Sequence, residues 1–254
     1  MITVVCCFND VAKYNTILKP SLEKQLDVQF EIVTIDNTEG DYCSAADAFN
    51  HAMKNVKYEY VVFLHQDFAF SDKYALKMIY VELSKLDYRC VIGAAGAVKD
   101  KKAGFTKKII GRDRNIISNL KPRFLDTSTG LRKVETVDEC CFALSKRLWE
   151  EHHFDNTICF SWDLYAVEMC LYARVQGGNC YVVPIRGIHL SYGKMGKDFF
   201  RSLQLLSTAY CEKIDYIITT CVVVKCGKNK TLRILFLSVV NNVRNLKNSV
   251  MRRR

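Results

Sequence analysis

The sequence predicts an α/β fold with a mostly parallel central sheet, flanked by helices and followed by a basic helical C-terminal extension. Short apolar runs rich in β-branched residues are typical of strands buried on both faces of a parallel sheet. In the first hundred residues these runs alternate with segments that carry apolar side chains at helical spacing. Three of the runs end abruptly in polar residues, and open α/β sheets bind ligands at that carboxyl edge.

The first two predicted strands cover residues 2–8 and residues 30–35, and they run into Asp10 and Asp36. Two parallel strands that each end near a carboxylate provide what a ribose or uracil edge needs. Asp and Asn are also common turn formers after strands, so both interpretations stay open from these residues alone.

Amphipathic patterns predict helices between the strands. One covers residues 14–26, with Pro20 at a first turn or a kink. A second covers residues 44–55, with Ser44 as its N-cap, and a third covers residues 74–86.

The third strand, residues 60–64, is the clearest, and it ends in His65-Gln66-Asp67. Asp67 supplies a hard oxygen ligand, and His65 faces the same way two residues earlier along an extended chain. A strand that simply ends in a polar turn would have the same pattern, because short motifs are weak evidence alone.

The remaining chain continues the alternation. Residues 99–133 are polar, basic and long for a loop, so we expect a flap over the site or a small hairpin there. The other predicted elements are strands at 90–98, 134–144 and 179–185, and helices at 146–152, 162–175 and from 197 onward.

Composition limits the classes of binding partner and the cellular compartment that we expect for this chain. The 254 residues carry a formal net charge of +10, which favours nucleotides, nucleic acid or an acidic membrane surface. The 12 cysteines include no Cys-x-x-Cys pair, so we expect reduced, buried thiols and no zinc ribbon. The opening Met1–Val5 has neither a basic segment nor a cleavage site, so we expect a cytoplasmic protein.

The tail, residues 216–254, interleaves bulky apolar residues with Lys and Arg. This pattern suits a helix in a membrane interface, and it equally suits a helix packed on the domain with a solvated basic face. No apolar run reaches the length of a membrane span. We expect peripheral contact with the inner face of the plasma membrane.

Several short motifs occur in a fixed order along residues 1–195. They are Phe8-Asn9-Asp10, Ile35-Asp36-Asn37, Ala45–Asn50, Val62–Asp67, Val137-Asp138-Glu139, Phe154-Asp155, Trp162–Glu168 and Gly187-Ile188-His189. Together they resemble the inverting glycosyltransferases of family 2, with His65-Gln66-Asp67 as a variant of the Asp-x-Asp motif. The resemblance implies a GT-A catalytic domain at residues 1–195, with residues 196–254 as the basic helical extension.

The resemblance also implies a nucleotide-sugar donor, linked to UDP or GDP. By position, Asp36 would bind the base or ribose, and Phe8 and Asn9 would line the nucleotide pocket. The rest of the implied donor-binding set is Asn50, His65 and Gln66.

A divalent metal, Mn²⁺ or Mg²⁺, is implied as well. Asp67 would ligate the ion or hold its water, and His189 would complete the coordination. A carboxylate with an imidazole suits Mn²⁺ better than Mg²⁺. Outside this family pattern, His189 would be interpreted as an uncoordinated histidine at a strand end.

Charge must be stabilised on the diphosphate that leaves the anomeric carbon. A divalent ion and basic side chains do this. Candidates in the basic stretch are Lys107, Lys108, Arg112 and Arg114, where a solvated charge run is the alternative.

A carboxylate must take the acceptor hydroxyl's proton while that oxygen attacks from the face opposite the diphosphate, in one displacement with inversion. The family's usual acidic pair falls at Tyr165-Ala166, and neither residue is acidic. Asp163 would project from the same side of a helix as Ala166, so it is the predicted base, with Glu168 and Asp138 in reserve. Stabilisation of a helix N-terminus is the alternative role for Asp163.

The predicted function is therefore transfer of a sugar to a glycan or lipid-linked acceptor in cell-surface polysaccharide or glycolipid assembly. A sugar-nucleotide-forming nucleotidyltransferase would need a glycine-rich loop after the first strand, and residues 6–10 contain no glycine. A non-catalytic basic module for membrane or nucleic acid is the other alternative. No zinc-finger or RNA-recognition signature is present, so nucleic acid is not an expected partner.

Overall fold

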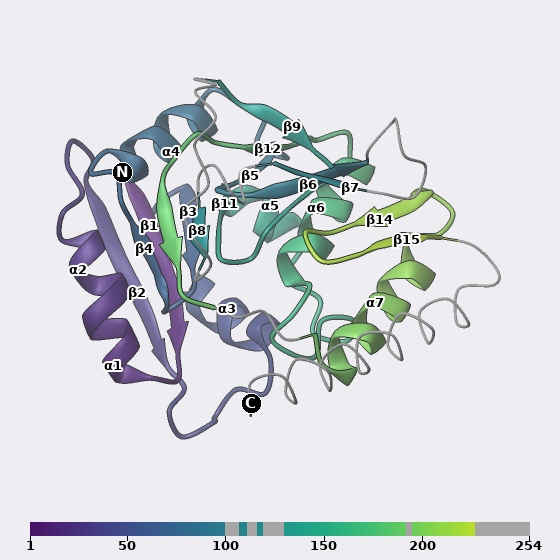
Figure 1. Cartoon of the computed structure of the whole chain (residues 1–254), viewed down its shortest axis with the longest axis horizontal. Coiled ribbons are helices and arrows are strands. Elements are labelled where there is room, and N and C mark those ends of the chain that lie inside the picture. Colours follow the sequence, from purple (N-terminus) through teal and green to yellow (C-terminus); the bar gives the residue numbers. More distant parts are fainter. Residues whose placement is uncertain (100–106, 111–115, 119–129, 192–194, 227–254) are drawn as a thin grey trace, which may run out of the picture.

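The computed structural model describes residues 1–99, 107–110, 116–118, 130–191 and 195–226. Its centre is a seven-stranded sheet (Figure 1). In spatial order the strands are β2 (Phe30–Asp36), β1 (Ile2–Phe8), β3 (Tyr60–Leu64), β11 (Cys141–Ser145), β5 (Val91–Gly93), β12 (Cys180–Val182) and β9 (Arg132–Val134). Only β11 and β9 run antiparallel to their neighbours, so the predicted, mostly parallel α/β sheet is confirmed.

Helices cover both faces of this sheet. Side chains of β3 alternate between two cores: Val61 and Phe63 enter one, whereas Val62 and Leu64 enter the other. The first core is closed by α3 (Ala45–Met53), α5 (Lys146–Glu151), α6 (Tyr165–Val175) and α7 (Lys197–Ala209). The second is closed by α2 (Lys19–Leu22) and α4 (Ala75–Ser84).

Two of the predicted helix starts can be compared with their caps. Ser44 caps α3 as predicted, because its hydroxyl accepts a hydrogen bond from Asp47 N at 3.1 Å. The first helical stretch, made of α1 (Val11–Lys13), a π-helical turn (Tyr14–Leu18) and α2, begins earlier than predicted. Asp10 explains this start, since its carboxylate accepts from Lys13 N at 3.0 Å.

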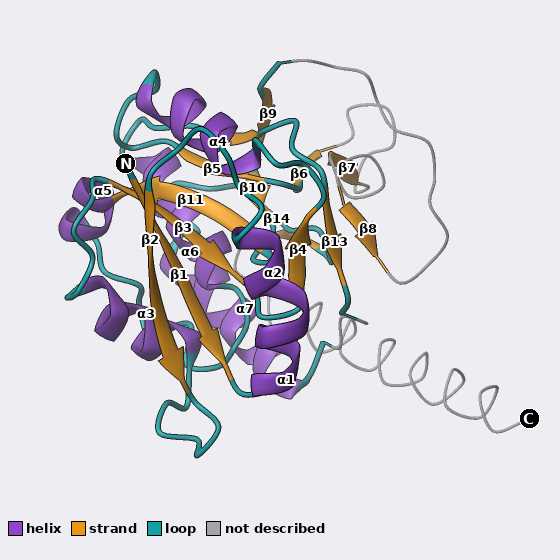
Figure 2. Ribbon diagram, turned by 90° about the vertical axis from the view of Figure 1, so that its left-hand side faces the viewer, coloured by secondary structure: helices purple, strands orange, loops and turns teal. Residues whose placement is uncertain are grey.

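Smaller sheets surround the large one. The first contains β10 (Thr136–Val137), β6 (Gly96–Lys99) and β7 (Lys107–Ile110), and the second contains β4 (Phe68–Phe70), β13 (Gly187–His189) and β8 (Ile116–Ser118). Figure 2 shows β4 and β13 side by side. The predicted flap thus supplies strands β7 and β8, while Arg112 and Arg114 lie outside the described residues.

Two predicted strands are each divided. Residues 90–98 form β5 and β6 in different sheets, and residues 134–144 contribute to β9, β10 and β11. Glycine allows the close packing at this division. A Cβ on Gly93 would lie 2.7 Å from Val137 Cβ, and one on Gly96 would lie 2.5 Å from Thr136 O.

The chain after residue 195 packs on the first core. Phe199 and Leu203 of α7 and Val224 of the hairpin β14 (Tyr216–Ile218) and β15 (Val223–Lys225) are all buried there. Residues 216–225 are therefore a hairpin, which corrects the helix expected at the start of the tail. The domain boundary at 195 stays a prediction.

No helix within the described residues combines the length and apolar character needed to cross a membrane. Residues 227–254, which carry most of the predicted membrane-binding tail, lie outside the described residues. The membrane contact and the cytoplasmic location therefore stay predictions.

Candidate functional site

His65, Asp67 and His189 meet at the carboxyl end of β3. His65 Nδ1 lies 3.3 Å from His189 Nε2, and His189 Nε2 lies 3.3 Å from Asp67 Oδ1. The ligand atoms of all three side chains lie within 4.8 Å of one another. The structure thus brings together Asp67 and His189, as predicted, and adds His65 to the cluster.

Pairing of β4 with β13 explains how His189 reaches a cluster that begins 124 positions earlier. His189 pairs with Phe68, the residue after Asp67, and Leu190 N donates to Asp67 O at 3.0 Å. The strands approach closely because Gly187 has no side chain: a Cβ there would lie 2.3 Å from Phe68 Cζ.

Burial sets the charge state of the cluster. It lowers the pKa of His65 to about 4, and the charge of His189 acts in the same direction. Burial would raise the pKa of Asp67, but its hydrogen bond and charge interaction with His189 outweigh that effect and hold the pKa below its usual value. At neutral pH the cluster therefore offers a neutral imidazole and a carboxylate.

This donor set fits a divalent metal ion. Ligand atoms that share one ion through bonds of about 2.0–2.2 Å lie about 2.8–3.6 Å apart, from octahedral to tetrahedral geometry, and both 3.3 Å distances at His189 fall in that range. Two imidazoles with one carboxylate favour a transition metal over Mg²⁺, which prefers oxygen ligands.

A pocket of about 220 Å³ lies beside the cluster. Its lining contains Cys7, Phe8, Asn9, Phe49, Leu64, His65, Gln66, Asp67, Trp162 and Tyr165. Four predicted donor-binding residues are therefore in its wall: Phe8, Asn9, His65 and Gln66. Trp162, whose surface is 42% exposed, was missed, although an aromatic residue directly before the predicted base was a signal.

Gln66 fixes one wall of the pocket by holding the loop after β1. Its Oε1 accepts hydrogen bonds from Asn9 N at 3.0 Å and Asp10 N at 2.9 Å, and its Nε2 donates to Asn9 Oδ1 at 2.6 Å. The middle residue of the His-Gln-Asp motif is therefore structural support for this pocket.

Asp36 and Asn50 do not line this pocket. Asp36 ends β2 opposite Phe8, and it accepts hydrogen bonds from Thr38 N and Thr38 Oγ1, which lower its pKa. The Asn50 amide is bonded elsewhere: its Nδ2 donates to Phe154 O at 2.8 Å, and its Oδ1 accepts from Trp149 Nε1 at 2.9 Å.

Asp163 precedes helix α6 rather than lying on it. The helix begins at Tyr165 because Leu164 takes a left-handed conformation, with φ of 69°. The expectation that Asp163 and Ala166 share a helix face is therefore wrong. Burial and the negative charge of Asp198 raise the pKa of Asp163 to about 6, while the Ser161 side chain acts in the opposite direction.

The reserve acids are more heavily bonded. Asp138 accepts from Thr220 Oγ1 at 2.6 Å and Cys140 N at 3.2 Å; burial would raise its pKa, but these bonds and the charge of His189 lower it. Glu168 is buried in another network, where its Oε1 lies 2.8 Å from His152 Nε2 and 2.6 Å from the Tyr210 hydroxyl.

Glu139, in the Asp-Glu dipeptide of the fifth motif, is an acid to which the sequence assigned no role. Burial and the charges of Asp163 and Asp138 raise its pKa well above the usual value, while the Leu164 N–H bonds its carboxyl. Its Oε1 is buried without a hydrogen-bond partner among the described residues. Glu139 thus links the segments that carry Asp138 and Asp163.

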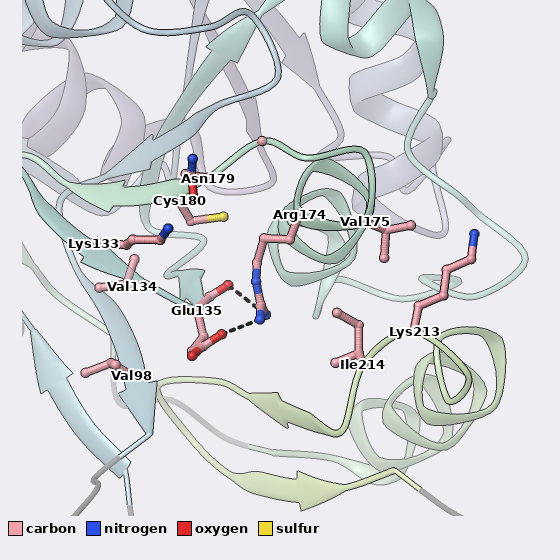
Figure 3. A pocket seen from close by; sticks show the side chains of 11 residues that line it. Val98, Lys133, Val134, Glu135, Arg174, Val175, Asn179, Cys180, Lys213 and Ile214 are labelled. Carbon is pink, nitrogen blue, oxygen red and sulfur yellow. Dashed lines mark hydrogen bonds and ion pairs between the residues drawn. The ribbon is translucent and has the colours of Figure 1, made fainter.

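A second, larger pocket of about 710 Å³ lies at the far end of α6 (Figure 3). Arg174 forms an ion pair there with Glu135 and also donates to its backbone carbonyl at 3.4 Å. The two charges neutralise each other, and the cluster that could hold a metal ion lies beside the other pocket. The smaller pocket is therefore the candidate active site.

Comparisons with known proteins identify the family and the fold of the chain. The model of a glycosyltransferase-like family matches residues 3–226, whereas no curated protein sequence matches the chain. Among solved structures, TarS of S. aureus is similar with a TM-score of 0.54 and 15% identity, over 84% of this chain and 40% of that one. GalNAc-T7, crystallised with UDP, GalNAc and Mn²⁺, is similar with a TM-score of 0.56 and 13% identity, over 84% and 51%.

These two solved structures are GT-A glycosyltransferases, and at such low identity the similarity shows the fold alone. The chain spans about half of the GalNAc-T7 chain and less than half of the TarS chain.

Proposed function

Because the chain belongs to a glycosyltransferase-like family and has a GT-A fold, we propose that it is a metal-dependent inverting glycosyltransferase. The observation that carries the proposal is the convergence of His65, Asp67 and His189 within 4.8 Å, beside the pocket that Phe8 and Asn9 line. The donor would be a nucleotide sugar and the acceptor a hydroxyl of a glycan or lipid-linked glycan.

His65, Asp67 and His189 would hold the metal, and Mn²⁺ fits their two imidazoles better than Mg²⁺. When bound, a divalent ion neutralises charge that develops on a diphosphate leaving group. The GalNAc-T7 crystal, which contains UDP and Mn²⁺ on the same fold, supports this choice of ligands.

The small pocket would bind the donor. Phe8 offers an apolar surface, and Asn9 is held in place by Gln66. Asp36 lies outside the pocket lining but next to Phe8 at the carboxyl edge of the sheet, where it would accept from a ribose hydroxyl. Trp162 exposes a flat apolar surface at the same pocket, on which a sugar ring can pack.

Asp163 is our proposed general base. It is ionised at neutral pH, and its raised pKa makes it a stronger base than an ordinary aspartate. Its two competitors are more heavily bonded: donors bond both oxygens of Asp138. Two partners share one oxygen of the buried Glu168, whose other oxygen has no hydrogen-bond partner among the described residues. Asp163 would take the proton of the acceptor hydroxyl while that oxygen attacks the anomeric carbon.

Two substitutions separate these roles. Asp67→Ala should abolish metal-dependent donor hydrolysis and sugar transfer, because it removes the carboxylate of the cluster.

Asp163→Asn should retain donor binding while kcat falls by about 10²–10⁴-fold, the usual contribution of a general base. Donor hydrolysis and transfer would be followed by nucleotide release, with the surface variant Asp87→Ala as the control.

Retained, metal-dependent turnover in Asp67→Ala would place the metal elsewhere and contradict the proposal. Unchanged kcat in Asp163→Asn would exclude Asp163 as the base and leave Asp138, Glu139 and Glu168 as candidates. A screen of sugar nucleotides by thermal shift would identify the donor, since a ligand that binds only the folded protein raises its Tm.

A further inference from the structure

Tyr165 contacts the ring of His65 at the nitrogen that faces away from His189. Its hydroxyl lies 2.9 Å from His65 Nε2, on the opposite side of the imidazole from the Nδ1 that faces His189. The Tyr165 ring is 2% exposed and packs edge-on against Phe49, with ring centroids 5.3 Å apart. Its hydroxyl is therefore held in place by the core.

We propose that Tyr165 is a positioning residue that selects the metal-binding tautomer of His65. In this arrangement the Tyr165 oxygen accepts a hydrogen bond from His65 Nε2–H, which leaves the Nδ1 lone pair directed toward His189. The inference rests on the proposed function, since it concerns the same metal site.

The two ring nitrogens of His65 explain why a partner is needed. A neutral imidazole carries one proton, and the hydrogen bond made by one nitrogen decides whether the other is free to ligate. If Nδ1 carried the proton instead, that proton would lie between Nδ1 and His189 Nε2, which are 3.3 Å apart, and would block the side that faces the metal. A phenol hydroxyl can donate or accept, and by accepting from Nε2–H it supports the tautomer that keeps this side open.

The position of Tyr165 in the sequence also supports this role. Tyr165 stands where the family pattern would place one of its usual acids. By the same resemblance His65 occupies the position of the first acid of the Asp-x-Asp motif, and its Nε2 lies at hydrogen-bond distance from Tyr165. The two departures from the family pattern are therefore in contact, and Tyr165 serves as the partner of His65.

The test is the affinity for Mn²⁺ alone, measured by electron paramagnetic resonance on the full chain. Loss of a hydrogen-bond partner behind a metal-ligating histidine typically costs about 10–100-fold in metal affinity. We expect Tyr165→Phe to weaken Mn²⁺ binding by at least about tenfold. The matched control is Tyr172→Phe on the same helix. The Tyr172 ring stacks on His152, with ring centroids 3.9 Å apart, so this variant should bind Mn²⁺ like the wild type.

A double-mutant cycle with His65→Ala shows whether Tyr165 acts through His65. In the His65→Ala background, Tyr165→Phe should cause no further loss of Mn²⁺ affinity. An additional loss there, or a single variant with wild-type affinity, would overturn the inference while leaving the metal site intact. A wild-type protein that does not bind Mn²⁺ would overturn both this inference and the proposed metal dependence.

A measurement on the wild-type chain keeps the inference testable if Tyr165→Phe fails to fold. Nuclear magnetic resonance of ¹⁵N-histidine-labelled protein with diamagnetic Zn²⁺ reports which ring nitrogen of His65 is protonated. We expect Zn²⁺ at Nδ1 and a proton at Nε2. The reverse assignment would contradict the role of Tyr165.

Discussion

Asp163 sits where burial and the carboxylate of Asp198 both oppose its ionisation. Its pKa of about 6 is raised from the ordinary aspartate value of 3.8. A general base acts only when deprotonated, so we expect kcat to rise with pH through about 6 and then level off. A pH–rate profile under donor saturation measures this limb.

Asp198→Asn should move that limb to lower pH, because it removes the second cause of the raised pKa and leaves burial unchanged. Asp87→Asn, at an exposed loop, is the control and should not move it. A limb that stays in place in Asp198→Asn would show that another group controls the profile.

The same pKa has a consequence for folding. Between pH 4 and 6 the folded chain holds more protons at Asp163 than the unfolded chain does, so this group makes stability fall as pH rises through that window. Asp163→Asn lacks this fall. The difference in unfolding free energy between Asp163→Asn and the wild type should therefore shift in favour of the variant by up to about 3 kcal/mol as pH rises from 4 to 6. Above pH 6 this difference should stay constant.

At the scale of elements, the site depends on the contact between β4 and β13. Gly187→Ala would place a Cβ 2.3 Å from the buried ring of Phe68, so β13 must move and carry His189 with it. We expect a loss of about 1–3 kcal/mol in unfolding free energy, typical of overpacking, together with weaker Mn²⁺ binding. Chemical denaturation and Mn²⁺ titration measure the two effects.

Gly196→Ala is the matched control, since a Cβ at Gly196 meets no atom within 4 Å. It should keep wild-type Mn²⁺ affinity. If Gly187→Ala also kept it, the β4–β13 contact would not be what positions His189.

Sequence patterns predicted most of the large elements because their apolar periodicity is strong. The polar ends of β1, β2 and β3 were recognised, and the parallel register Phe8–Asp36 brings two of them together as expected. Short and non-local features were not predictable. Strand β4 has three residues, and its partner β13 is more than a hundred positions away, so no local pattern shows their pairing.

Backbone conformation explains the misplaced helix start. The apolar spacing around Leu164 suited a helix from residue 162, but Leu164 has a positive φ, which few leucines adopt and no hydrophobic pattern reveals. Likewise, His65 was assigned to the donor because the contact between its Nδ1 and His189 depends on tertiary structure.

At the scale of the whole molecule, the C-terminal part of the described chain packs on the same core as helix α6 and contacts acids of the candidate site. Thr220, in the turn between β14 and β15, donates to Asp138, and Asp198 of α7 acts on Asp163. The family match likewise continues to residue 226, beyond the predicted domain boundary at 195. Residues 196–226 therefore influence the charge of the candidate site.

The central claim is that a metal-dependent site holds the diphosphate of a sugar donor. Calorimetric titration of UDP and GDP into the wild-type chain and into His189→Ala, each with and without Mn²⁺, tests it most directly. We expect one of the two nucleotides to bind the wild type only when Mn²⁺ is present, and to bind His189→Ala weakly in either condition. Binding that is equally strong without Mn²⁺ and in His189→Ala, or no binding of either nucleotide, would contradict the claim.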